Sequence, residues 1–196
     1  MKVVAFNGSA RKDGNTAILV ETALRVLQEE GIETEHVQLA GMHLKGCAAC
    51  YRCFKDKGRC HQEDDGLNAF IEKMTSAQGV ILASPVYFAD VTANMKALME
   101  RAGMVARAAG DLLRRKVGAA VVAVRRGGAV HTFDSLNHFF SIGQMITVGS
   151  SYWNLGRGLQ PGDVKNDEEG IRTMQVLGEN LAWVLKKLHG PAVSGD

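Results

Sequence analysis

Five short runs of apolar or β-branched residues alternate along the chain with five segments whose apolar residues recur every three or four positions. The first pattern predicts strands and the second predicts helices. The run at 80–83 is apolar throughout, as expected of a strand covered on both faces. This alternation indicates an α/β fold with a five-stranded, doubly wound parallel sheet and helices on both faces. We expect strands over 2–6, 34–39, 80–83, 117–124 and 145–148. We expect five helices: one that begins near residue 15, one that includes 67–74, one over 92–109, one that includes 133–144 and one over 167–189.

A chain of 196 residues has the length of one domain, which we place at residues 1–189. Residues 40–63 follow neither pattern and are interpreted as a cysteine-rich insertion, 150–166 as irregular, and 190–196 as a tail. The formal net charge of +2 is too small and too dispersed for a nucleic-acid or membrane surface. No apolar run approaches the roughly 20 residues of a membrane span, and the first residues lack the apolar stretch of a signal peptide. We therefore expect a cytoplasmic protein.

The loop at 8–16 joins the first predicted strand to the first predicted helix. Its glycines allow a tight turn, and free N–H groups at a helix start attract an anion. Side-chain donors accompany them at Ser9, Arg11, Asn15 and Thr16. The loop is not a P-loop, since Asn15 stands where that motif has lysine, and it lacks the G-x-G-x-x-G of dinucleotide-binding folds. The alternative is a polar turn that only caps the helix, but its place in a doubly wound sheet favours a phosphate site.

Two further loops follow predicted strands, at the sheet edge where ligands of such folds bind. They consist of Ser84, Pro85, Val86, Tyr87 and Phe88, and of Arg125, Arg126, Gly127 and Gly128. Tyr87 and Phe88 offer flat surfaces to a flat ring, the alternative being ordinary core or interface aromatics. Two glycines directly after a strand indicate close backbone approach, although the two arginines also suit a solvated pair.

All four cysteines lie within 14 residues, at Cys47, Cys50, Cys53 and Cys60. A secreted disulfide framework spreads its cysteines, so a local run in a reducing compartment indicates a metal or redox site. Three thiols at two-residue spacing can wrap one side of a compact object, and the fourth can complete it. Zinc sites more often use two separated pairs, which makes zinc the weaker alternative. The segment follows the second predicted strand, so we expect it at the same sheet edge as the phosphate loop.

Taken together, the three loops and the cysteine run resemble the flavodoxin-like NAD(P)H-dependent FMN reductases, and more closely the iron–sulfur flavoproteins among them. Gly149-Ser150-Ser151-Tyr152-Trp153-Asn154 adds to the resemblance, which extends to about residue 189. It implies a flavodoxin-like strand order, 2-1-3-4-5. It also implies an FMN site. The phosphate would be held by Ser9, Arg11, Asn15 and Thr16, the isoalloxazine ring would lie along Pro85, Val86, Tyr87 and Phe88, and its other edge would be closed by Arg125, Gly127 and Gly128.

For the cysteines, the resemblance implies one [4Fe-4S] cluster that uses all four thiolates. Basic residues interleave the run and would offset the cluster's negative charge. Two alternatives stay open at this point. One is free or redox-active thiols without metal, since related flavoproteins keep similar cysteines without an established cluster, and the other is a zinc ion.

The resemblance implies an FMN-dependent oxidoreductase in which FMN exchanges electrons with a nearby cluster or an external carrier. NAD(P)H or a ferredoxin-like protein would be the redox partner. One alternative is an NAD(P)H-dependent FMN or quinone reductase with no cluster, and another is a non-catalytic electron-transfer module. Relatives associate as homodimers or homotetramers, and Tyr152 and Trp153 are candidate contacts by resemblance only.

Overall fold

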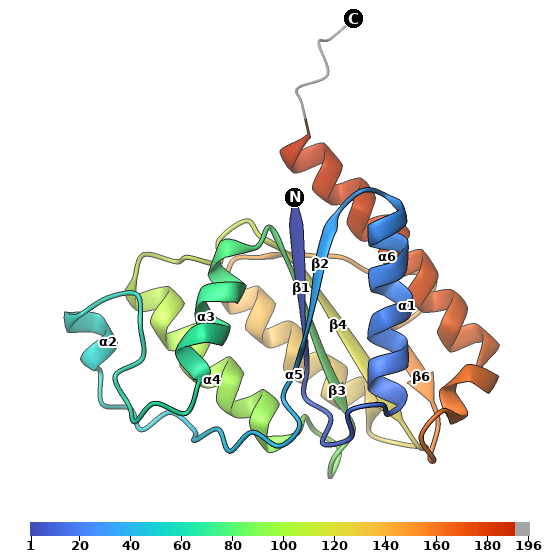
Figure 1. Cartoon of the computed structure of the whole chain (residues 1–196), viewed down its shortest axis with the longest axis horizontal. Coiled ribbons are helices and arrows are strands. Elements are labelled where there is room, and N and C mark those ends of the chain that lie inside the picture. The colour runs from blue at the N-terminus through green and yellow to red at the C-terminus, as the bar shows by residue number, and fades with distance from the viewer. Residues whose placement is uncertain (191–196) are drawn as a thin grey trace, which may run out of the picture.

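The computed structural model describes residues 1–190 and contains one parallel sheet with helices on both faces (Figure 1). The expected tail, beyond Gly190, lies outside the described residues. The strands are β1 (Lys2–Asn7), β2 (Glu33–Gln38), β3 (Gly79–Pro85), β4 (Val117–Val124), β5 (Ile146–Thr147) and β6 (Leu155–Arg157). The helices are α1 (Asn15–Glu29), α2 (Arg52–Lys55), α3 (Leu67–Ser76), α4 (Ala93–Ala108), α5 (Ala129–Ile142) and α6 (Glu168–His189), with a 3₁₀ turn η1 (Asp163–Asn166).

The strand order β2-β1-β3-β4-β5 confirms the flavodoxin-like topology expected from the sequence, and every pair is parallel. Successive residues of β1 point to opposite faces, and both faces are buried. Val3 packs with α1 and α6, whereas Val4 packs with α3, α4 and α5 (Figure 1). This two-sided burial explains why β3 and β4 are apolar along nearly their whole length. No helix among the described residues is long and apolar enough to cross a membrane.

The fifth strand position differs from the expectation, because two short strands share it. β5 pairs with the first half of β4, and β6 pairs with the second half, where irregular chain was expected. Between them the side chain of Asn154 donates to the carbonyl of Ala120 (2.9 Å) and bridges the interruption. β6 has only three residues, too few to show a period in the sequence. Gly156 is required there, since a Cβ atom would lie 2.6 Å from Leu19 Cδ2.

Candidate functional site

A cavity of about 170 Å³ lies at the carboxyl ends of β1, β3 and β4. The structure brings eight of the predicted cofactor-binding residues together around it, from three loops far apart in sequence. Its lining consists of Ser9, Arg11, Gly14, Asn15, Thr16, Pro85, Val86, Tyr87, Ala123, Arg125, Gly158 and Leu159. We call this the phosphate-loop cavity. Phe88, Gly127 and Gly128 are the predicted residues that do not line it.

The first wall of this cavity is the loop between β1 and α1. The N–H of Ser9 donates to Asn7 Oδ1 (2.9 Å), and the N–H of Arg11 donates to Ser9 Oγ (3.1 Å), so two side chains hold the turn. Gly14 then precedes α1 without any side-chain cap. The first N–H groups of a helix have no partner within the helix, so those of α1 are available to an anion. Together with the Arg11 guanidinium, they make this wall suitable for a phosphate.

Asn15 has a role that the sequence did not reveal. Its buried side chain donates to the carbonyl of Gln160 (2.9 Å) and accepts from the N–H groups of Gly162 (3.0 Å) and Val164 (3.3 Å). Arg11 Nη1 also donates to the carbonyl of Leu159 (3.1 Å). Both side chains therefore fasten the segment 158–164 over the start of α1, and this segment supplies another wall of the cavity. The partners are about 145 positions away, beyond the reach of any local sequence pattern.

The loop after β3 places its two aromatic residues differently. Tyr87 and Asp90 exchange backbone hydrogen bonds (2.8 and 3.0 Å), which closes a tight turn with positive φ at Phe88 and Ala89. Tyr87 lines the phosphate-loop cavity, whereas Phe88 is fully exposed. Gly128 buttresses this loop from the β4 side, since a Cβ atom on it would meet Ala89 Cα at 2.9 Å. Gly128 thus shapes the cavity by supporting the loop after β3.

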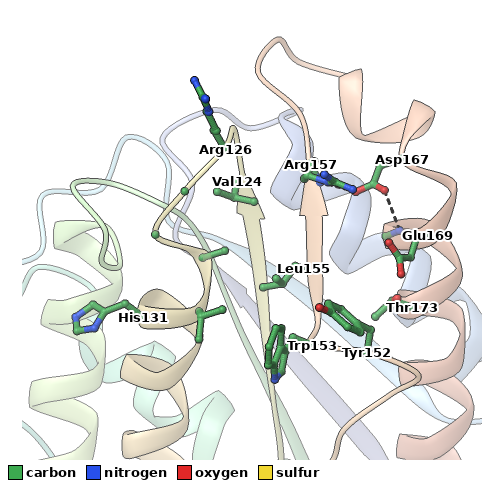
Figure 2. Close-up of a pocket in the computed structure, with 15 residues that line it drawn as sticks. Val124, Arg126, His131, Tyr152, Trp153, Leu155, Arg157, Asp167, Glu169 and Thr173 are labelled. Atoms are coloured by element: carbon green, nitrogen blue, oxygen red, sulfur yellow. Dashed lines mark hydrogen bonds between the residues drawn. The ribbon is translucent and has the colours of Figure 1, made fainter.

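A second cavity, of about 530 Å³, lies on the other side of the loop after β4, between the starts of α5 and α6 (Figure 2). Gly127 and Gly128 line it, along with both aromatics of the 149–154 segment. Tyr152 and Trp153 form an edge-to-face pair with ring centroids 4.9 Å apart, and both are about half exposed. Figure 2 shows Arg157 beside Asp167, whose carboxylate accepts from the N–H of Gly170 (3.1 Å). Opposite charges and aromatic surface thus meet in this cavity.

All four cysteines line one small cavity, with Arg101 and Met104 of α4 on its far side. Cys53 and Cys60 are buried, Cys47 is half-buried and Cys50 is exposed. The chain wraps around the cavity through left-handed residues at Ala49 and Tyr51, and then through the single turn of α2. This cavity shares no lining residue with the phosphate-loop cavity, and α2 packs against α4 beside α3 (Figure 1). We expected the cysteine segment at the same sheet edge as the phosphate loop, but it lies away from that edge, against α4.

The donor set of this cavity consists of thiols, which are ligands both of iron–sulfur clusters and of zinc. A zinc ion needs its thiolates about 2.3 Å from one point. Within residues 1–190, no three Cys, His, Asp or Glu side chains converge in that way. A [4Fe-4S] cube takes one thiolate on each iron, so it would use all four cysteines of this cavity. Hydrogen bonds from the N–H and the guanidinium of Arg52 lower the pKa of Cys50, which favours its thiolate, whereas burial raises the pKa of Cys53.

Polar side chains from α3 and α4 hold the cysteine segment in place. Glu100 accepts from the N–H of Cys47 (3.1 Å), and the amide of Asn68 bonds both the N–H (2.8 Å) and the carbonyl (3.0 Å) of Cys60. Arg101 Nε donates to Cys60 Sγ (3.2 Å), and its Nη1 pairs with Asp65 (2.5 Å). The sequence pattern does not reveal Arg101, because its helical spacing matches that of the apolar residues around it.

The comparisons with known proteins agree with this geometry. Residues 1–160 match the family model described as NADPH-dependent FMN reductase. An iron–sulfur flavoprotein of Methanocaldococcus jannaschii is 44% identical over 193 residues, which cover 95% of this chain and 98% of that protein.

Solved structures match the fold at low sequence identity. A flavodoxin, WrbA-like protein from Agrobacterium tumefaciens has a TM-score of 0.64 at 14% identity, with 95% of this chain and 97% of that one covered. RosB, solved with bound 8-demethyl-8-formylriboflavin-5'-phosphate, has a TM-score of 0.72 at 19% identity, with 97% and 82% covered. The chain therefore belongs to the NADPH-dependent FMN reductase family of FMN-dependent oxidoreductases, and within it to the iron–sulfur flavoproteins.

Proposed function

We propose that the phosphate-loop cavity holds FMN and that Cys47, Cys50, Cys53 and Cys60 hold one [4Fe-4S] cluster. The chain would then pass electrons between FMN, the cluster and an external redox partner. The observation that carries this proposal is the pair of cavities, one lined by three loops at the ends of parallel strands and the other by all four cysteines. Bound FMN supplies the change from two-electron to one-electron chemistry, and the protein positions the ring and tunes its potential.

Each wall of the phosphate-loop cavity has a separate task in this proposal. Arg11, Ser9 and Thr16, with the N–H groups that begin α1, would bind the phosphate. Asn15 would act through the 158–164 segment that it fastens. Tyr87 would lie along the ring, as part of a turn that Gly128 supports. The ring would then lie against Tyr87 and the backbone of this turn, which suits a cofactor that carries its own reactivity.

The cysteine cavity is lined by four thiols. None of the described residues that line it is an Asp or Glu, whose carboxylate could compete with the thiols for a metal. Hydrogen bonds from the N–H and the guanidinium of Arg52 lower the pKa of Cys50 and favour the thiolate at that one position. Soft thiolate ligands of this kind select iron–sulfur clusters, zinc or copper(I). The spacing of the four cysteines, which resembles that of the iron–sulfur flavoproteins, favours the cluster among these.

Anaerobic purification with a visible spectrum and iron and sulfide analysis tests the proposal directly. About four iron and four sulfide per chain are expected beside one FMN. The Cys53→Ala variant should lose iron and keep its flavin, because a cube needs all four thiolates and the two cavities are separate. His61→Ala is the matched control, since His61 lines the same cavity without a thiol. Stoichiometric zinc, or four freely titratable thiols with no iron, would overturn the cluster and leave an FMN reductase.

The same anaerobic preparation identifies the electron donor. An NAD(P)H-linked enzyme should lose its flavin absorbance on addition of NADH or NADPH. A ferredoxin-linked protein should do so only with a reduced ferredoxin-like carrier. Steady-state NAD(P)H oxidation close to zero would favour the electron-transfer module over the reductase.

A further inference from the structure

We infer that Arg101 is a positioning residue that sets the reduction potential of the cluster through its hydrogen bond to Cys60. This inference rests on the proposed function, since it needs a cluster on the four cysteines. Arg101 projects from the middle of α4 and is 1% exposed, which makes it the largest fully buried side chain of the described residues. Its Nε lies 3.2 Å from Cys60 Sγ, at hydrogen-bonding distance for a sulfur acceptor.

A second nitrogen of Arg101 bonds to residues that precede and follow the four cysteines in the sequence. Its Nη1 donates to the carbonyl of Lys45 (3.2 Å) and pairs with the carboxylate of Asp65 (2.5 Å). Burial disfavours the charged guanidinium, but the hydrogen bonds to Asp65 and Cys60 outweigh that effect and raise the pKa of Arg101. Burial also disfavours the charged carboxylate of Asp65, but Arg101 and the Lys45 N–H outweigh it and lower the pKa of Asp65. The contacts of Nη1 and Nε together fix this ion pair beside one sulfur.

Stability alone does not explain a charged pair at this place. Buried ion pairs are often no more stabilising than apolar residues of similar volume, because both charges lose their hydration. The neighbouring buried positions of α4 are apolar, among them Leu98, Ala102 and Val105. A methionine or leucine at 101 would continue that face. The guanidinium differs from such residues in what it offers the sulfur, namely an N–H donor and a positive charge at a buried position.

The effect on a cluster has a definite sign. One-electron reduction adds one negative charge to the cluster and its thiolates, with no bond made or broken and no proton required. A cation and an N–H donor at a ligating sulfur stabilise the reduced form more than the oxidised form, so they raise the potential. Asp65 partly cancels this effect, because its carboxylate pairs with the same guanidinium and carries the opposite charge. Substitutions of the two partners should consequently move the potential in opposite directions.

An anaerobic redox titration of the whole protein with dithionite and mediators tests this inference, with the cluster followed by its paramagnetic signal. Arg101→Gln should lower the reduction equilibrium constant of the cluster at least tenfold, which corresponds to about 59 mV for one electron. Asp65→Asn should raise it, and it preserves the shape of the pair. Arg101→Lys keeps the charge and loses the Nε donor, so its potential should lie between those of the wild type and Arg101→Gln. Arg107→Gln removes an exposed arginine from the same helix and should leave the potential unchanged.

The outcomes separate this inference from the function on which it rests. Opposite shifts for Arg101→Gln and Asp65→Asn support it. Full iron content with an unchanged potential in both variants overturns it and leaves the proposed function standing. Loss of iron from both Arg101 variants, with flavin retained, would assign Arg101 a purely structural role and also overturn it. A wild-type protein that binds no iron overturns the proposed cluster and this inference together.

Discussion

Gly128 supports the loop that would lie along the flavin ring, and replacing it with alanine should disturb both stability and binding. Its φ of +87° lies in the left-handed region, where an L-residue costs about 1–2 kcal/mol. An added Cβ would lie 2.9 Å from Ala89 Cα and 3.0 Å from Val86 Cγ1, so the backbone of the neighbouring loop must move. Overpacking of this kind costs about 1–3 kcal/mol. The two effects together predict a loss of about 2–5 kcal/mol in the free energy of unfolding.

Thermal unfolding of the FMN-free protein measures this loss, which corresponds to a fall of about 4–20 °C in Tm for a chain of this size. FMN titration should also show weaker binding and an altered visible spectrum, because the displaced loop carries Tyr87. Gly127→Ala is the matched control. A Cβ atom added to Gly127 would meet nothing within 4 Å, and this glycine has no positive φ, so its substitution should be nearly neutral. If Gly128→Ala unfolds within about 0.5 kcal/mol of Gly127→Ala, the supporting role of Gly128 is refuted.

Three further changes test other parts of the molecule. Asn15→Ala should destabilise the FMN-free protein by about 1–3 kcal/mol and weaken FMN binding, since it unfastens the 158–164 segment; unchanged urea denaturation would contradict this. Tyr87→Ala should alter the fluorescence and the reduction potential of the bound flavin more than it alters phosphate affinity. If FMN and riboflavin bound to the variant both keep their wild-type values, Tyr87 is a structural aromatic. Hydrogen bonds from Lys2, and to a smaller extent from Lys73, lower the pKa of Glu35 in the folded protein. The contribution of Glu35 to the free energy of unfolding is therefore present above the unfolded pKa of about 4.3 and is lost as the pH falls through the lower folded pKa. Glu35→Gln should therefore unfold at lower urea than the wild type near neutral pH, and the difference should shrink in acid.

The central strands and the loops after them were predictable, because their signals are local. β3 and β4 are apolar along nearly their whole length; β3 ends at Pro85, and Gly127 and Gly128 follow β4 closely. The phosphate loop likewise has its donors within nine residues. What the sequence could not show depends on distant partners. The side chain of Asn15 bonds to the backbone of Gln160, Gly162 and Val164, far along the chain. β6 forms because the second half of β4 can pair with three residues that are too few to show a period.

The cysteine spacing shows a different limit, in which a local pattern indicates a site but not its surroundings. The four thiols meet around one cavity, in agreement with their spacing, yet the wall that faces them comes from α4. Arg101 and Glu100 on that helix, with Asn68 on α3, hold the segment through its backbone and one sulfur. The flavin loops contribute none of these contacts. A change in the cysteine segment should therefore alter the proposed cluster while the phosphate-loop cavity keeps its shape. Because the two cavities share no lining residue, the iron content and the flavin content of one variant can be measured as independent quantities.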